Sequence, residues 1–177
     1  MRLLTCAWIV LWAAVLVAQN LQGAVQGTNR PQSGQLIGTW RLVSRSTTLA
    51  DGTQKEDPNL GTTPMGYLVY DASGHVFAQL MKRDRTIDEM KICGVQSAAG
   101  QNNSTTVCGY DVYAGTYTVE NDSTVLHHLE MAISPADVGK VIRRSFRVHG
   151  DKLTISFATT TSDSKPITRS VVWERVK

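Results

Sequence analysis

Two polar residues interrupt apolar strand patterns in the second half of the chain, and their side chains are the ones best suited to chemistry. His127 alternates with apolar residues over 124–133, and Arg144 does the same over 140–148. Because alternate residues of a strand share one face, both side chains are expected to point into an apolar interior. An imidazole can transfer a proton, and a guanidinium can bind both oxygens of a carboxylate or an enolate.

A buried arginine needs a partner, since the burial of an unpaired charge costs several kcal/mol. Asp111, a tyrosine hydroxyl or an anionic ligand would serve. A few convergent polar groups among apolar walls are typical of a small-molecule pocket. The residues expected to contact a ligand are therefore Tyr113, Tyr117, His127, Arg144 and Phe146.

The same residues also have a structural interpretation. A histidine on an apolar face is more often a hydrogen-bonded core residue than a ligand contact. An arginine can bury its stem while its charged head reaches the rim. For His127 alone we favour the structural interpretation, whereas for His127 and Arg144 together the two interpretations are balanced.

Other chemistries find little support in the motifs. His127 and His128 cannot share a metal ion, because adjacent strand residues point to opposite faces, and no third ligand is evident. The sequence contains no nucleophile elbow, phosphate-binding loop or metalloprotease motif. We expect no metal and no cofactor, and we assign no catalytic residue. In an enzyme, His127 would move a proton and Arg144 would stabilise an enolate.

The N-terminus indicates export. Arg2 precedes an uncharged apolar run from Ala7 to Ala18, which is too short to span a bilayer comfortably. We predict a signal peptide over 1–18, and cleavage could fall as late as residue 24. The mature protein is then expected to be secreted or periplasmic and to have no membrane partner. An uncleaved anchor is the alternative.

The polar composition of 19–35 predicts a disordered lead-in to a domain over 36–177. The net charge of +3 is not gathered in a basic run, so no nucleic-acid partner is expected.

Two cysteines remain after the signal peptide. Cys93 and Cys108 are predicted to form a disulfide, which would close a loop of about 15 residues and contribute roughly 3 kcal/mol. A redox or metal pair is the alternative, but the two residues lack the close spacing that such chemistry needs. Glycosylation sequons begin at Asn102, Asn103 and Asn121, and their use depends on the source organism.

Short strands and turn motifs alternate along the domain. Strands are predicted at 37–48, 66–71, 75–82, 109–119, 124–133, 140–148, 152–160 and 167–176. Eight strands with short connections predict an all-β, antiparallel up-and-down barrel, with a β-sandwich as the alternative. Residues 50–64 are expected to form a surface loop. Residues 84–90 are expected to form one or two helical turns that, with the following cysteine loop, cover one mouth of the barrel.

The alternation also assigns faces. In the first strand Trp40 and Leu42 share one face, and Arg41, Val43 and Arg45 share the other. The inward set of 124–133 consists of its odd positions, Met131 included.

The chain resembles the lipocalin-like domain family of the calycin superfamily from about Leu36 to Val176. The resemblance lies in the order and spacing of several short matches: Gly38-Thr39-Trp40, Met65 to Asp71, Ala78 to Met81, Tyr113 to Tyr117, His127-His128, Arg144, Gly150 to Thr154 and Trp173 to Val176. It implies a closed barrel with an internal cavity. It also implies that Trp40 packs against Arg175, or alternatively Arg169, through a cation–π contact of about 0.5–2 kcal/mol. The polar 84–108 segment departs from the helix-rich stretch of the family.

Three functions are compatible with these observations. The leading one is a barrel that binds a small, mainly apolar molecule with a polar or anionic end near Arg144 and His127. The second is an isomerase or cyclase that acts on a small hydrophobic substrate in the same cavity. The third is a structural or interaction domain with a packed interior.

Overall fold

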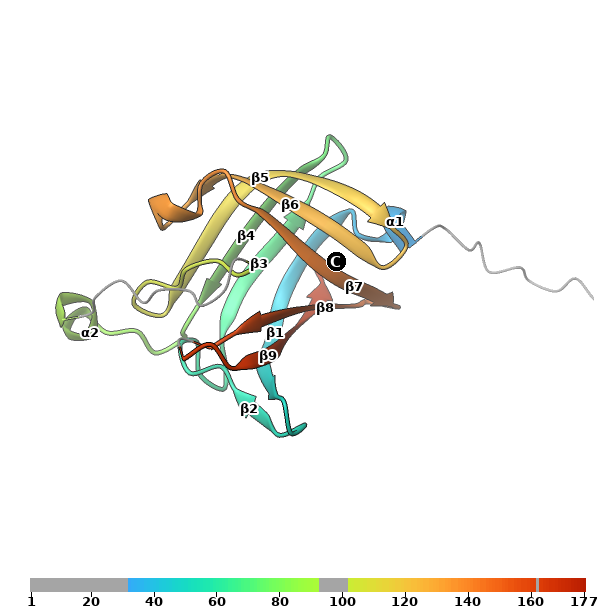
Figure 1. Cartoon of the computed structure of the whole chain (residues 1–177). Coiled ribbons are helices and arrows are strands. Elements are labelled where there is room, and N and C mark those ends of the chain that lie inside the picture. Colours follow the sequence, from blue (N-terminus) through green and yellow to red (C-terminus); the bar gives the residue numbers. More distant parts are fainter. Residues whose placement is uncertain (1–31, 93–101, 162) are drawn as a thin grey trace, which may run out of the picture.

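Alternating apolar and polar residues along short strands fold this chain into one sheet that closes on itself (Figure 1). The computed structural model describes residues 32–92, 102–161 and 163–177. The predicted signal peptide, most of the predicted lead-in, and Cys93 lie outside the described residues, so the predicted signal peptide and disulfide stay predictions.

The strands follow the predicted order with one addition, the short strand β2. The strands are β1 (Gly38–Leu49), β2 (Gln54–Glu56), β3 (Met65–Tyr70), β4 (His75–Met81), β5 (Tyr110–Asn121), β6 (Thr124–Ala132), β7 (Val141–His149), β8 (Lys152–Thr160) and β9 (Pro166–Arg175). The helices are α1 (Gln32–Gln35), α2 (Ile87–Ile92) and the 3-10 turn η1 (Pro135–Asp137). Within the described ranges, none of these helices is long and apolar enough to cross a membrane.

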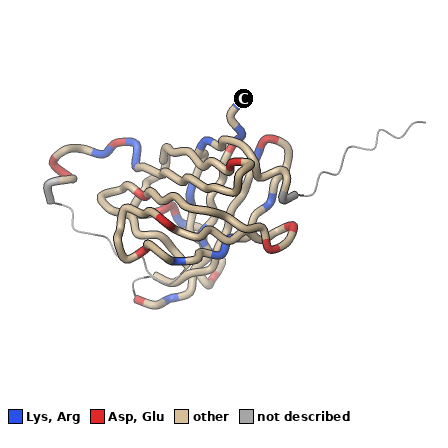
Figure 2. The backbone as a smooth tube through the Cα atoms, turned by 90° about the horizontal axis from the view of Figure 1, so that it is seen from above, with Lys and Arg blue, Asp and Glu red and all other residues tan. Residues whose placement is uncertain are grey.

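The sheet is a closed, eight-stranded antiparallel barrel with up-and-down order, which confirms the predicted fold. Strands β3 to β9 pair in sequence, β1 pairs with β3 on one edge, and β1 pairs with β9 on the other to close the barrel. Strand β2 pairs only with the far end of β1, over Ser46–Thr48. Along the backbone, positive and negative residues are interspersed rather than gathered in blocks (Figure 2).

Two irregularities in the pairing correct the predicted faces. The register of β1 against β9 shifts between Leu42 and Ser44, so the second half of β1 changes phase and Arg45 is buried rather than outward. On β6 a second shift, opposite Ala114 and Gly115, leaves Met131 on the outer surface, 67% exposed. In both strands one extra residue moves every later side chain to the other face.

Trp40 closes one end of the barrel. Its indole Nε1 donates a hydrogen bond to the Leu36 carbonyl at 2.8 Å, and the Arg175 guanidinium lies 4.0 Å from its ring centroid. Arg175 also donates to the carbonyls of Gln35 and Ile37. Residues 32–35, predicted as part of a disordered lead-in, form α1 at this end, where the carbonyl of its last residue, Gln35, accepts a hydrogen bond from Arg175. Helix α2 lies at the opposite end (Figure 1).

The 50–64 connection is more than a surface loop, which corrects the prediction. Asp57 and Leu60 within it are both buried. The Asp57 Oδ1 atom accepts hydrogen bonds from the backbone N–H groups of Asn59 and Leu60, and these bonds form a tight turn that places the carboxylate inside the barrel. The loop therefore supplies a buried negative charge to the interior.

Candidate functional site

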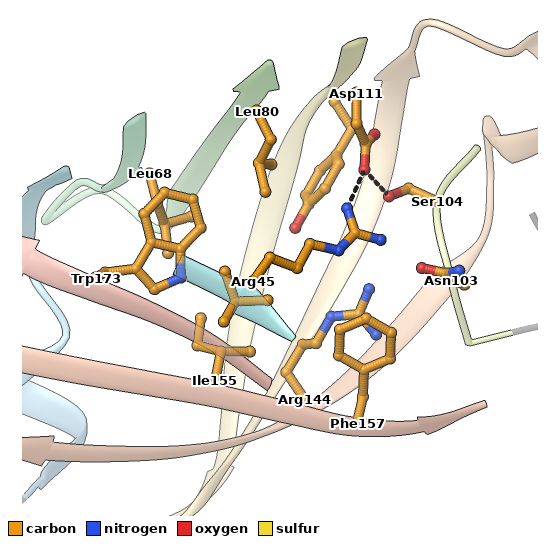
Figure 3. Close-up of a pocket in the computed structure, with 12 residues that line it drawn as sticks. Arg45, Leu68, Leu80, Asn103, Ser104, Asp111, Arg144, Ile155, Phe157 and Trp173 are labelled. Atoms are coloured by element: carbon orange, nitrogen blue, oxygen red, sulfur yellow. Dashed lines mark hydrogen bonds and ion pairs between the residues drawn. The ribbon is translucent and has the colours of Figure 1, made fainter. Parts of the chain in front are cut away.

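A cavity of about 30 Å³ lies between side chains that point into the barrel (Figure 3). Its apolar walls come from Leu68, Leu80, Ile155, Phe157, Val171 and Trp173, and its polar lining from Arg45, Asn103, Ser104, Asp111, Tyr113 and Arg144. This volume holds one or two water molecules or one small polar group. Drug-sized ligands occupy about 300–1,000 Å³. The cavity has the composition of a ligand pocket but not the size of one.

Arg144 projects into this cavity from β7 and is only 3% exposed. Its guanidinium carbon lies 3.7 Å from the centroid of the Phe157 ring. Its Nη1 donates to the backbone carbonyl of Asn102 at 2.7 Å and to the Asn102 Oδ1 at 3.0 Å. No carboxylate of the described residues lies within ion-pairing distance of it. Arg144 is therefore a buried cation whose described hydrogen-bond acceptors are neutral.

Arg45 enters the same space from β1 because of the bulge described above. Its Nε lies 2.9 Å from Asp57 Oδ2, and its Nη1 lies 3.9 Å from Asp111 Oδ2. Arg169 of β9 approaches the same Asp57 oxygen at 3.5 Å. The Arg45 Nη2 atom is buried and has no hydrogen-bond acceptor among the described residues. Asp57 thus pairs with two arginines, and each of them keeps a buried N–H group without a hydrogen-bond acceptor among the described residues, Nη2 in Arg45 and Nε in Arg169.

Asp111 is the second buried carboxylate, at 2% exposed. Its Oδ2 accepts a hydrogen bond from the Ser104 hydroxyl at 2.5 Å and faces Arg45 (Figure 3). Burial raises the pKa of this carboxyl, while the charge of Arg45 opposes the rise. A raised pKa weakens the compensation that Asp111 provides to the arginines.

The buried cluster carries an excess of positive charge. Three guanidiniums, Arg45, Arg144 and Arg169, face two carboxylates, Asp57 and Asp111. Burial lowers the pKa of Arg169 to about 10 and lowers the pKa of Arg144 as well. Both shifts record the cost of keeping these cations out of water. An anion bound among them would offset that cost.

His127 is buried next to the cavity-lining Tyr113 and lies between two phenols. Its Nε2 is 2.7 Å from the Tyr70 hydroxyl, and its Nδ1 is 3.0 Å from the Tyr113 hydroxyl. Burial, with a smaller contribution from Arg144, holds the pKa of His127 well below 6.5. A neutral imidazole has one donor and one acceptor, so one phenol donates to the ring and the other accepts from it. Burial also raises the pKa of Tyr113 to about 12, so both partners stay protonated at neutral pH.

The depressed pKa of His127 makes folding stability depend on pH. As the pH falls below about 6.5, the unfolded chain takes up a proton that the folded chain refuses. Burial of the neutral His127 therefore does not reduce the free energy of unfolding above about pH 6.5. Below that pH the free energy of unfolding falls by about 1.4 kcal/mol per pH unit, until the pH reaches the pKa of His127 in the folded protein. We expect His127→Gln to remove this slope between about pH 6.5 and 5.5, as measured by urea denaturation.

His128→Gln is the matched control for this prediction. His128 follows His127 directly on β6, but its ring is hydrogen-bonded to Thr118 on the outer surface. This variant is expected to keep the wild-type slope. Equal slopes for all three proteins would show that the His127 imidazole takes up its proton in the folded and unfolded chains alike.

The structure places the five predicted ligand contacts in different surroundings. Tyr113 and Arg144 line the cavity, whereas His127 does not line it and is hydrogen-bonded to the Tyr113 hydroxyl. Phe146 packs in the hydrophobic core, and the Tyr117 hydroxyl donates to the Asp71 carbonyl. Whether any of them touches a ligand stays a prediction. In the described geometry, Tyr113 rather than His127 presents a titratable group to the cavity.

Sequence reasoning missed Arg45 and Asp57. Strict alternation from Trp40 assigned Arg45 to the outside, and only the pairing of β1 with β9 reveals the shift. Asp57 precedes a proline in a polar loop, and this pattern predicts only a turn. Nothing in it predicts that the second carboxylate oxygen of Asp57 pairs with a buried arginine. A basic residue in a strand and an acid in a long loop carry no local signal that they will meet.

The three sequons differ in accessibility. Asn103 is 1% exposed, and the Asn102 amide is engaged with β7 and β8. Asn121 lies on the exposed turn between β5 and β6, where its Oδ1 accepts from the Ser123 backbone. Only the Asn121 side chain stands in a position that a glycan could occupy without opening the barrel.

Comparison with known families agrees with this architecture. The sequence model of a family described as a lipocalin-like domain matches residues 37–176. No curated protein matches the chain. The matched range begins at the first residues of β1 and ends just after β9, so it covers the whole barrel. A fold of this family is in general a ligand-binding barrel.

Proposed function

Because the chain belongs to the lipocalin-like domain family, we propose that its barrel binds a small, mainly apolar molecule with an anionic end. One observation carries the proposal: two buried guanidiniums, Arg45 and Arg144, face one apolar-walled cavity. The anionic end would lie between them. The apolar body would lie against Leu68, Ile155 and Val171. Binding would occur in the exported form of the protein, from which the predicted signal peptide has been removed.

The charge of the cluster favours a carboxylate over a neutral ligand. The free Nη2 donor of Arg45 gains an acceptor, and the excess positive charge of the cluster is neutralised. Charge-assisted hydrogen bonds of this kind contribute about 1.5–3 kcal/mol each. An alcohol of the same length would fill the same apolar space but would leave the charge imbalance unchanged.

A pair of matched probes tests this proposal. Decanoate and decanol have equal carbon chains and differ in the charge of the head group. We expect decanoate to bind at least about tenfold more tightly in calorimetric titrations at neutral pH. Equal affinities would contradict an anionic anchor, and binding of neither probe would contradict the proposed function.

A packed barrel is the second candidate, and the small cavity favours it. Eight-stranded barrels have interiors that side chains can just fill. In a packed barrel the arginines and aspartates are purely structural, and neither probe changes the thermal stability of the protein. The enzyme hypothesis has less support, because His127 does not line the cavity.

A further inference from the structure

A short polar segment, Asn102–Thr106, is buried from its second residue onward, and two of its side chains line the cavity. Asn103, Ser104, Thr105 and Thr106 are each at most 5% exposed, although all four side chains are polar. Burial of such groups is unfavourable unless each one finds a hydrogen-bond partner. The segment therefore has a reason to be there other than the hydrophobic effect.

Hydrogen bonds hold the first part of this segment to β7 and β8. The Asn102 Oδ1 accepts from the Arg143 backbone N–H at 2.8 Å, and its Nδ2 donates to the Ala158 carbonyl at 3.2 Å. The same Oδ1 and the Asn102 carbonyl also accept from Arg144. The side chain of one asparagine thus bridges two neighbouring strands above the cavity.

Hydrogen bonds to acidic side chains hold the rest of the segment. The Ser104 hydroxyl donates to Asp111 on β5, and the Thr105 backbone N–H donates to Asp137 Oδ2 of η1 at 2.6 Å. Each of these charge-assisted bonds contributes about 1.5–3 kcal/mol, and water or a ligand that hydrogen-bonds to the released groups offsets part of that loss. The segment is therefore attached by polar contacts that a competitor can replace.

The contact with Arg144 resembles a bound carboxylate. Two oxygens of one residue, the Asn102 carbonyl and Oδ1, lie 2.7 and 3.0 Å from the Arg144 Nη1. A carboxylate also presents two oxygens to a guanidinium, but it can accept from two of the nitrogens and carries a full negative charge. The neutral amide oxygens leave the charge of Arg144 largely uncompensated. A ligand carboxylate at this position would bind more strongly than the segment does.

The fit of the segment is also incomplete. The Asn103 Oδ1 is buried and has no hydrogen-bond partner among the described residues. Such a group costs free energy that release of the segment recovers. With the segment in place the cavity of about 30 Å³ admits a head group but not an apolar body.

We propose that Asn102–Thr106 is an internal plug. Its Asn102 oxygens occupy the position on Arg144 that the carboxylate of a ligand would take, so the plug and the ligand cannot be bound there at the same time. The inference rests on the proposed function, because it names what regulates access to the same site. The ligand carboxylate replaces the two Asn102 oxygens, and the apolar body enters the space that the plug vacates. The affinity of the barrel then depends on how often the plug is released.

A plug-weakening variant tests this directly. Ser104→Ala removes the bond to Asp111, and we expect decanoate to bind about fivefold more tightly than to the wild type, because more of the protein is open. Ser73→Ala is the matched control. The Ser73 hydroxyl also donates to an aspartate, Asp71 Oδ1 at 2.8 Å, but in an exposed turn. Its affinity for decanoate should equal that of the wild type.

Amide hydrogen exchange in the wild-type protein gives a readout that needs no variant. Ligands usually slow exchange near their sites, whereas release of the plug predicts faster exchange at the Thr105 amide when decanoate is added. Tighter binding by Ser104→Ala and faster exchange at Thr105 would support the plug. Equal affinities of all three proteins with slower exchange would overturn the plug and leave the proposed function standing. No binding by any of the three would overturn both.

Discussion

Replacement of Asp57 by alanine is expected to lower the free energy of unfolding by about 3–5 kcal/mol. The Asp57 Oδ2 faces both Arg45, at 2.9 Å, and Arg169, at 3.5 Å. Without it, Arg169 loses its carboxylate partner and Arg45 keeps only Asp111 among the described residues, and burial already raises the pKa of that carboxyl. The turn through Asn59 and Leu60 also loses its acceptor. Urea denaturation followed by tryptophan fluorescence measures the loss.

Asp51 provides the control for this prediction. It lies in the same 50–64 connection, and its Oδ1 accepts a backbone hydrogen bond from Thr53, but it is exposed and has no buried cation to serve. Asp51→Ala should lower the free energy of unfolding far less than Asp57→Ala, because water replaces the lost acceptor at this exposed position. Similar losses for the two variants would mean that the buried charge cluster contributes little beyond its turn hydrogen bonds.

Replacement of Arg144 by methionine is expected to weaken decanoate binding by about 10- to 100-fold. The methionine fills the space beside Phe157 but offers no donor to a carboxylate. Stability should stay the same or rise, because a buried cation without a carboxylate partner among the described residues is replaced by an apolar side chain of similar volume. Calorimetric titration and urea denaturation of the same preparation separate the two effects.

Arg143 is a close match for the control, since it is the neighbouring residue on β7 and points outward. Its guanidinium pairs with Glu120 on the barrel surface. Arg143→Met should bind decanoate as the wild type does. A loss of decanoate binding in both variants, or in neither, would contradict the prediction that the Arg144 guanidinium binds the carboxylate.

The barrel itself could be predicted from the sequence because its cause is local. Period-two alternation and turn residues determine where strands begin and end, and the predicted strands differ from the observed ones by one or two residues. Trp40 and Arg175 lie at the two ends of the matched motifs, and their contact follows once β1 and β9 close the barrel. The short strand β2 was missed because three exposed polar residues carry no alternation.

The site was only partly predictable, because its remaining parts depend on non-local contacts. Arg144 and Tyr113 were found by their strand phase, because burial alternates without a break along β7 and along the first half of β5. Arg45 was missed because a bulge is decided by the pairing of two strands and not by either sequence alone. Asp57 and the plug come from loops, where the backbone direction has no periodicity to extrapolate.

The central claim is that the buried guanidiniums anchor an anionic ligand, and native mass spectrometry of protein purified from its natural source tests it most directly. The wild-type chain is predicted to carry a small organic acid that is lost on denaturation, and the Arg144→Met variant from the same source is predicted to carry none. Bare chains in both preparations, or the same bound mass in both, would contradict the claim.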